Sequence, residues 1–398
     1  MPGPHINALV VGSLVCALPA GAQQQAQTLS VGNQRFEARV PAGTKLEFLA
    51  GGMDGPRLPA FAPAGELLIG AKDGKVYRLK PPYTRVETLV DFGGYPHGIA
   101  VRGAELFVAE THGLYRAAYD SAAPGPRRAD FTLVTPLPAG GGHSSRSLGA
   151  GPDGRLYVSL GISDNCPDEY LDDSYPFERR RGGIFVLDER KAAPQLKPFA
   201  SGLRNPVGFD WHPVTKEMYA ANNGPDHLGF DEPREVFVRV REGGFHGMPW
   251  YQWIGGALKR DDCISSNPPR APESGWQPAA TFDARNAPLG MAFAPANAAW
   301  PEGAAVALHG SWGTLPDGGF VGNPATRRPP KIVFVRFENG RAGPVEDWVT
   351  GFQLPNGKRW ARPAGVAFGP DAALYFTSDD GTLQGLFRLR PVASTRTL

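Results

Sequence analysis

The sequence predicts an all-β protein with the architecture of a six-bladed β-propeller. Three observations carry this expectation: a repeated strand–turn–strand unit, a high content of glycine and proline, and no break in composition along the chain. The chain has 398 residues, of which 51 are glycine and 40 are proline, and 41% are hydrophobic. Such a composition is typical of many short strands joined by tight turns, and it is too hydrophobic for a disordered chain.

The repeat consists of a strand, a turn rich in proline, aspartate and glycine, a second strand and a third. Six such units begin at Ala60, Gly98, Leu148, Gly208, Gly290 and Gly365. A short sheet cannot bury both of its faces alone, so the units are expected to pack face to face around an axis. A spare strand at residues 43–50 is expected to close the ring by pairing with the last blade. A β-sandwich, or two small β domains, is the alternative arrangement.

Short segments flank the expected propeller, which covers residues 43–392. Residues 1–22 are apolar and then small, and Ala20-Gly21-Ala22 fits a signal-peptidase site, so a signal peptide and a periplasmic or secreted protein are expected. A buried N-terminal strand or a wrongly chosen start codon is the alternative. Residues 23–42 are an N-terminal extension and residues 393–398 a C-terminal tail. No other apolar run is long enough to span a membrane.

Charge and cysteine content exclude several classes of partner and cofactor. The 41 basic and 39 acidic residues give a net charge of +2, and no basic run occurs, so no nucleic acid is expected to bind. Cleavage after Ala22 removes Cys16 and leaves Cys166 and Cys263. In an oxidising compartment these two either form one disulfide or remain free thiols. The chain has no C-x-x-C-H motif for covalent haem.

Polar side chains stand just before the innermost strands of several units. The stretches "SSRSLGAGPD" and "RPAGVAFGPD" align without a gap, and four units supply residues to one expected ring: His97, His143, Arg146, Arg204, Asn205 and Arg362. Arginine binds carboxylates and phosphates through two N–H groups, so the ring suits an anion that carries several of them. His143 suits a general base, because imidazole titrates near neutral pH. Strand-end capping or pairing with acidic residues is the alternative for each.

The fourth unit and the insertion after it add two further candidate sites. The acidic stretch "NNGPDHLGFDEPREV" at residues 222–236 combines a Gly-Pro turn, which exposes carbonyl oxygens, with carboxylates. Such hard oxygen ligands suit calcium; an acidic turn paired with nearby arginines is the alternative. The insertion at residues 246–286 contains Trp250 and Tyr251. Their rings either stack on a sugar or form the core of a long loop.

Several motifs now occur together in the order of a known family. They include "GGHSSRS", "GLRNPVGF", "NNGPDHLGFDEPREV", "REGGFHGMPW", "ALHGSWG" and "RPAGVAFGPDAALYFTSDD". In these motifs the chain resembles the pyrroloquinoline quinone (PQQ)-dependent sugar dehydrogenases, most closely the L-sorbosone and pyranose dehydrogenase branch. The resemblance implies a propeller that holds PQQ over Ca²⁺ and oxidises an aldose or sorbosone-type sugar by hydride transfer. Its partners are then the sugar and an external electron acceptor, either a quinone or a cytochrome.

The resemblance also implies roles for individual residues. His143 resembles the base that takes the sugar hydroxyl proton. The residues that match motifs at the cofactor are Arg204, Asn205, His309, Trp312 and Arg362, and the arginine ring adds Arg146. The carbonyl oxygens of Gly224 and Pro225 match the calcium ligands, with Asp226 in support. For the sugar, the candidates are His97, Trp250 and Tyr251.

The chain departs from the family at two places. Ile162 follows Gly161 where glucose dehydrogenases have an aspartate that supports the base. The stretch "HGSWGT" lacks the arginine of "HGSWNR", so one cofactor cation is missing unless another residue replaces it; the candidates are Arg327, Arg328 and Arg359. A calcium-dependent propeller lactonase and a non-catalytic binding propeller are the alternative functions. The arginine- and histidine-rich axis favours an anionic cofactor over a metal alone.

Overall fold

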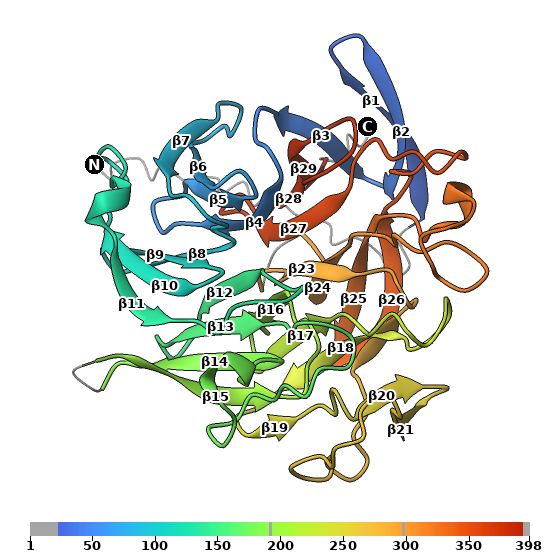
Figure 1. Cartoon of the computed structure of the whole chain (residues 1–398). Coiled ribbons are helices and arrows are strands. Elements are labelled where there is room, and N and C mark those ends of the chain that lie inside the picture. The colour runs from blue at the N-terminus through green and yellow to red at the C-terminus, as the bar shows by residue number, and fades with distance from the viewer. Residues whose placement is uncertain (1–22, 191–192, 297–298, 393–398) are drawn as a thin grey trace, which may run out of the picture.

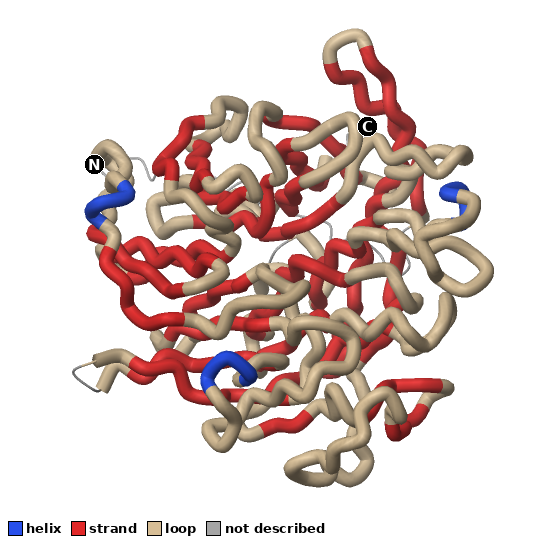
Figure 2. Tube along the Cα trace, in the orientation of Figure 1, coloured by secondary structure: helices blue, strands red, loops and turns tan. Residues whose placement is uncertain are grey.

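The computed structural model describes residues 23–190, 193–296 and 299–392, in which six mainly antiparallel sheets surround a central axis (Figure 1). This confirms the six-bladed propeller. The predicted signal peptide and the predicted C-terminal tail lie outside the described residues. Figure 2 shows that strands and turns make up nearly all of the fold. Helical structure in the described part consists of three short 3₁₀ turns, at Arg128–Asp130, Phe177–Arg179 and Pro324–Thr326.

Each of the first three blades has its innermost strand first in the sequence. Blade one consists of β4 (Pro56–Phe61), β5 (Leu67–Ala71), β6 (Lys75–Leu79) and β7 (Glu87–Asp91). Blade two consists of β8 (Gly98–Arg102), β9 (Glu105–Glu110), β10 (Gly113–Ala118) and β11 (Thr132–Pro136). Blade three consists of β12 (Arg146–Ala150), β13 (Leu156–Leu160), β14 (Gly183–Asp188) and β15 (Gln195–Ser201), with β19 (Gly244–Phe245) parallel to its outer edge.

The last three blades follow the same order, but two of them recruit a distant strand. Blade four consists of β16 (Gly208–Trp211), β17 (Met218–Asn222), β18 (Glu235–Val240) and β22 (Ala280–Phe282). Blade five consists of β23 (Pro288–Phe293), β24 (Gly303–Leu308), β25 (Lys331–Glu338) and β26 (Arg341–Val349). Blade six consists of β27 (Pro363–Phe368), β28 (Leu374–Ser378), β29 (Gly385–Pro391) and β3 (Thr44–Ala50).

Two hairpins lie outside the blades, as Figure 1 shows. The first, β1 (Gln24–Val31) with β2 (Gln34–Pro41), packs Leu29 and Val40 into the core between blades five and six. The second, β20 (Tyr251–Ile254) with β21 (Ala257–Arg260), belongs to the long insertion. Among the described residues no helix is both long and apolar enough to cross a membrane.

Pairing between β3 and β29 closes the ring, as the sequence predicted. Leu46 of β3 and Leu389 of β29 face each other in register, and both are buried in one apolar cluster. At the surface, Glu47 accepts hydrogen bonds from Arg388 at 2.8 Å and from Arg390 at 3.0 Å. Residues from the two ends of the described chain thus complete one blade.

The core consists of apolar clusters between neighbouring blades. One cluster joins blades one and two through residues such as Val76 and Val108, and another joins blades five and six. In the latter, the rings of Phe334 and Trp348 stack at 3.9 Å between centroids. Burial of apolar surface between blades is therefore the main attraction that holds the ring together.

At the axis the inner strands approach so closely that a side chain would not fit. A Cβ atom on Gly98 of blade two would lie 2.4 Å from the carbonyl oxygen of Arg146 in blade three. A Cβ atom on Gly208 of blade four would lie 2.2 Å from the carbonyl oxygen of Leu289 in blade five. Glycine permits this approach, and the channel between the inner strands is reduced to about 90 Å³.

We predict that Leu46→Ala lowers the free energy of unfolding by about 2–5 kcal/mol, because it leaves a cavity in the strand that closes the ring. Urea denaturation measures the change. Lys45→Ala is the control: Lys45 neighbours Leu46 in β3, but its side chain is 52% exposed. Equal losses in the two variants would contradict the closure role.

Candidate functional site

A cavity of about 680 Å³ lies at the end of the channel where the inner strands begin. Arg57 and Leu289, the second residues of β4 and β23, line the cavity, and so does Asn205 in the connection that precedes β16. The predicted site residues that line it are His143, Arg204, Asn205, Gly224, Asp226, His309 and Trp312. The structure therefore brings residues of the third, fourth and fifth units together, including three of the six residues of the predicted ring, His143, Arg204 and Asn205.

His143 is held in one orientation by the backbone rather than by a carboxylate. Its Nδ1 donates a hydrogen bond to the carbonyl oxygen of Ile162, the residue that stands where glucose dehydrogenases have an aspartate. That bond fixes the tautomer, so Nε2 is the ring nitrogen that can accept a proton. Burial, with the charge of Arg204 as a second cause, lowers the pKa of His143 to about 4. The imidazole is therefore neutral at pH 7.

Arg204 belongs to a charged cluster on one wall of the cavity. Its Nη2 donates to Asn165 Oδ1 at 2.8 Å and lies 3.3 Å from Asp226 Oδ2. Arg285 approaches the other carboxylate oxygen of Asp226 through Nη1 at 3.2 Å. Both oxygens of Asp226 thus face a guanidinium, which suits a supporting role better than direct ligation of a metal.

A buried aspartate, Asp379, holds two residues that line the cavity, His309 and Arg57, and also pairs with Lys72. Asp379 accepts from His309 Nε2 at 2.6 Å, pairs with Lys72 Nζ at 2.8 Å and also binds Arg57 Nη1. Burial favours the neutral acid, but His309 and Arg57 hold the pKa of Asp379 well below its usual range. The ionised carboxylate keeps the proton of His309 on Nε2.

The Gly224–Pro225 turn has the features of a cation site. Gly224 donates its N–H to Glu235 Oε2, and a Cβ atom on Gly224 would lie 3.1 Å from Pro233 Cγ. Burial raises the pKa of Glu235 to about 8. The structure thus provides a tightly packed turn with carbonyl oxygens and a carboxyl group immediately beside it, the donor types that calcium prefers.

Two predicted arginines do not line the cavity. Arg146 is fully buried and donates to three backbone carbonyl groups, those of Pro138, His143 and Ser145. Arg362 donates to the carbonyl oxygens of His309 and Gly310, and its guanidinium lies 4.0 Å from the ring centroid of Trp312. Both arginines therefore bind the backbone of residues that line the cavity and do not line it themselves.

The three candidates for the sugar also lie away from the cavity. His97 is fully buried and packs against the ring of Tyr95. Trp250 is fully buried in a small cluster within the insertion, and Tyr251 packs against the same cluster. For Trp250 and Tyr251 the structure therefore agrees with the alternative that the sequence left open, the core of a long loop.

Arg57, Asn165 and Arg285 line the cavity but were missed in the sequence. Arg57 stands at the start of its inner strand, much as Arg362 does, so the repeat alignment contained a signal for it. Asn165 and Arg285 lie in irregular loops without such a signal. Arg57 and Arg285 place two further cationic side chains in the cavity, whereas Arg327, Arg328 and Arg359 do not line it.

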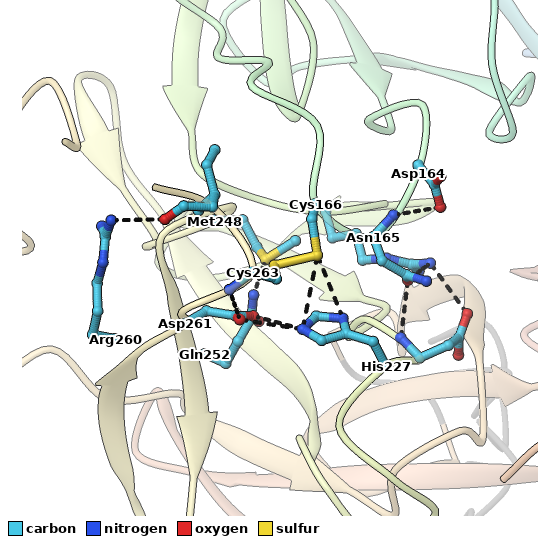
Figure 3. The surroundings of a disulfide bond; sticks show 12 residues. Asp164, Asn165, Cys166, His227, Met248, Gln252, Arg260, Asp261 and Cys263 are labelled. Atoms are coloured by element: carbon cyan, nitrogen blue, oxygen red, sulfur yellow. Dashed lines mark hydrogen bonds and ion pairs between the residues drawn. A yellow bond between two sulfur atoms is a disulfide. The ribbon is translucent and has the colours of Figure 1, made fainter. Parts of the chain in front are cut away.

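Cys166 and Cys263 form a disulfide, with their Cα atoms 5.9 Å apart and a separation of 97 positions in sequence (Figure 3). Cys263 belongs to the insertion, so the bond ties that insertion to the loop that carries Asn165. The ring of His227 lies between Cys166 and Asp261, with its Nε2 at 3.1 Å from Asp261 Oδ2. The alternative of two free thiols is thereby excluded.

A second cavity, of about 470 Å³, lies beside blade four. Tyr219, His246 and Trp276 line it, and it contains none of the predicted site residues. The cavity at the channel end is therefore the candidate active site.

Comparison with known proteins identifies the family. The profile of the TrAA12-like family matches residues 38–237, just over half of this chain. The chain belongs to the TrAA12-like family. An uncharacterized protein of Borreliella burgdorferi is 23% identical over 364 residues, which cover 86% of this chain and 88% of that protein.

Several solved structures share the fold of this TrAA12-like protein. The calcium structure of the Trichoderma reesei family AA12 enzyme matches with a TM-score of 0.71 and 19% identity, covering 88% of this chain and 96% of that one. The holo PQQ domain of Coprinopsis cinerea pyranose dehydrogenase matches with a TM-score of 0.71 and 18% identity, covering 91% and 100%. The PQQ-bound aldose sugar dehydrogenase of Streptomyces coelicolor matches at 0.60 and 17%, covering 88% and 100%. The predicted resemblance to PQQ-dependent sugar dehydrogenases is confirmed.

We predict that Gly161→Ala destabilises this TrAA12-like protein, because the new methyl group would lie 2.5 Å from Asn205 Oδ1 and 2.7 Å from His143 Cβ. The expected loss is about 1–3 kcal/mol in the free energy of unfolding, measured by urea denaturation. Gly343→Ala is the control, because its nearest atom would be 3.7 Å away. A stability of Gly161→Ala equal to that of the control would show that the cavity wall is not tightly packed there.

Proposed function

We propose that the protein oxidises an aldose or sorbosone-type sugar, with PQQ as its redox cofactor and Ca²⁺ as the ion that binds the cofactor. The observation that carries the proposal is that one cavity unites His143, Arg204 and the Gly224 turn. Membership of the TrAA12-like family supports an oxidoreductase of this type. The volume of the cavity lies in the usual range for sites that bind a cofactor-sized ligand.

The donor groups of the cavity fit a tricarboxylate cofactor and a hard cation. Arg57, Arg204 and Arg285 provide guanidinium groups for carboxylates, and the Nε atoms of Arg57 and Arg204 are buried without a hydrogen-bond partner among the described residues. The carbonyl oxygens of Gly224 and Pro225 would hold the calcium ion. When bound, PQQ with Ca²⁺ supplies the hydride acceptor and the Lewis acid.

The residues of the chain then have separate tasks. His143 accepts the hydroxyl proton of the sugar at Nε2, while its Nδ1 remains bonded to Ile162. Asp226 keeps Arg204 and Arg285 in place, and Asp379 does the same for Arg57 and His309. Trp312, which lines the cavity and is 54% exposed, offers an apolar face at its mouth.

A calcium-dependent lactonase is the second candidate, because it uses the same fold and metal. Such an enzyme needs carboxylate side chains on the metal to activate water. Here both oxygens of Asp226 face guanidinium groups, and Glu235 binds the N–H of Gly224. This arrangement favours the dehydrogenase. We further propose an exported enzyme that passes electrons to an external quinone or cytochrome, since an oxidising compartment suits its disulfide.

Reconstitution tests the proposed function. We predict that the purified protein binds PQQ in a calcium-dependent manner and then reduces a dye when an aldose is added, because the predicted contacts are noncovalent. Arg204→Ala should weaken quinone binding about tenfold or more, since it removes a charged partner. Arg102→Ala, at a surface ion pair with Glu189, should leave it unchanged. Full activity in excess chelator without PQQ would reject the cofactor, whereas lactone hydrolysis that needs Ca²⁺ but no PQQ would favour the lactonase.

We predict that His143→Gln leaves quinone binding nearly intact but slows its reduction by sugar about 10²–10⁴-fold, the usual effect of removing a general base. The base acts in its neutral form, so protonation removes activity as the pH falls through its pKa. Because that pKa is lowered to about 4, the wild-type rate should persist well below pH 6. Stopped-flow kinetics with normal and deuterated sugar measure the step. His97→Gln is the control, and a wild-type rate in His143→Gln would exclude this base.

A further inference from the structure

The side-chain oxygen of Asn165 links Arg204 to the residue that follows the Gly224–Pro225 turn. Asn165 Oδ1 accepts a hydrogen bond from Arg204 Nη2 at 2.8 Å and another from the backbone N–H of Asp226 at 2.9 Å. The first bond fixes the guanidinium that would bind a carboxylate. The second fixes the residue that directly follows the Gly224–Pro225 turn. A shift of Asn165 would therefore disturb the arginine and the turn together.

The loop that carries Asn165 is anchored on both sides of that residue. Asn165 lies in the irregular segment between β13 and β14. Upstream, Ile162 donates its N–H to the carbonyl oxygen of Arg204, and Ser163 donates its N–H to Glu169 Oε2. Immediately downstream, Cys166 is bonded covalently to Cys263 of the insertion. The disulfide thus fixes the residue next to Asn165.

The partner cysteine is itself held in a fixed place. Its N–H donates to Asp261 Oδ1 at 3.1 Å, and Asp261 in turn donates its N–H to the carbonyl oxygen of Trp250 at 2.8 Å. Trp250 is fully buried, so the insertion offers a rigid base for the bond. Figure 3 shows this path from Asp261 through the two sulfur atoms to Asn165.

The disulfide is also open to reagents in solution. Cys263 is exposed, and Cys166 is partly exposed. Disulfide exchange requires access of a thiolate to one sulfur atom, and exposed disulfides are the ones that respond to the redox conditions around them. The bond that fixes Asn165 is therefore one that an external thiol can reach.

We propose that Asn165 is a positioning residue that sets the affinity for the cofactor through Arg204 and the Gly224–Pro225 turn, and that the Cys166–Cys263 disulfide makes this affinity sensitive to external dithiols. The inference rests on the proposed function. Reduction by a dithiol breaks the S–S bond: the protein disulfide takes up two electrons and two protons to become two thiols, and the dithiol that supplies them is oxidised to its cyclic disulfide. Asn165 then loses its covalent anchor, and both of its hydrogen bonds weaken.

Quinone titration tests the proposal with the oxidised and the dithiothreitol-reduced protein, each with saturating Ca²⁺. We expect Asn165→Ala to weaken PQQ binding about tenfold, the effect of losing a hydrogen bond to a charged group. Reduction of the wild type should weaken it by a similar factor. Reduction of Asn165→Ala should add little, because both changes act on one contact. Asn267→Ala, at an exposed position of the insertion, is the matched control.

A second measurement does not depend on the quinone. Hydrogen exchange at the Asp226 amide should become faster in Asn165→Ala and in the reduced wild type, because Asn165 Oδ1 is the acceptor of that amide. Cys166→Ser with Cys263→Ser should reproduce the reduced state and be insensitive to dithiothreitol. If this double variant does not fold, Asn165→Ala alone carries the test.

The outcomes separate this inference from the proposed function. A lower midpoint of thermal unfolding with unchanged PQQ affinity in the reduced protein would show a merely stabilising disulfide and overturn the inference. Unchanged exchange at Asp226 in Asn165→Ala would overturn it as well. Faster exchange in a protein that binds no PQQ in either redox state would reject the proposed function while the positioning role of Asn165 stands.

Discussion

Close approach of the inner strands is the constraint on which the rest of the structure depends. Glycine stands at Gly98, Gly208, Gly290 and Gly365, and at each of these positions a Cβ atom would lie less than 3 Å from the neighbouring blade. The strands can therefore converge until the channel is nearly filled. Because all six begin at one end, the residues that precede them meet above the axis. The candidate site follows directly from this convergence.

The cavity combines cationic groups with carboxylates that hold them in place. Asp226 binds Arg204 and Arg285, and Asp379 binds Arg57 together with His309. Each carboxylate lowers the cost of burying its arginines and restricts their orientation. A polyanionic ligand therefore meets guanidinium groups that are already oriented, and little side-chain ordering remains for the binding step.

The fold could be predicted from the sequence, and so could those site residues whose positions recur from one repeat to the next. His143, Arg204 and Asn205 were predicted because their positions relative to an inner strand recur along the chain. Arg146 and Arg362 occupy equivalent positions, yet their guanidinium groups turn to backbone carbonyl oxygens. An alignment of repeats gives the position of a residue and not the direction of its side chain.

Other features depend on contacts that no local pattern encodes. Asn165 and Arg285 come from irregular loops, and only the folded chain brings them beside Asp226. The imidazole of His143 uses a backbone carbonyl where the family pattern suggested a carboxylate, so the missing aspartate did not imply a missing partner. Cys166 and Cys263 were recognised as a possible pair, but their bond needed the geometry of the insertion.

Ring closure has a consequence for how the molecule assembles. Glu47 and Arg388 are 341 residues apart in sequence, yet they are partners in one blade. Contacts of such long range slow folding, because a large loop must close before they form. Asp379 directly follows β28 of that same last blade, so the anchor of Arg57 and His309 forms only after the other five blades have been synthesised. A chain without its last blade therefore lacks the complete pocket, and binding competence arises only once that blade has docked.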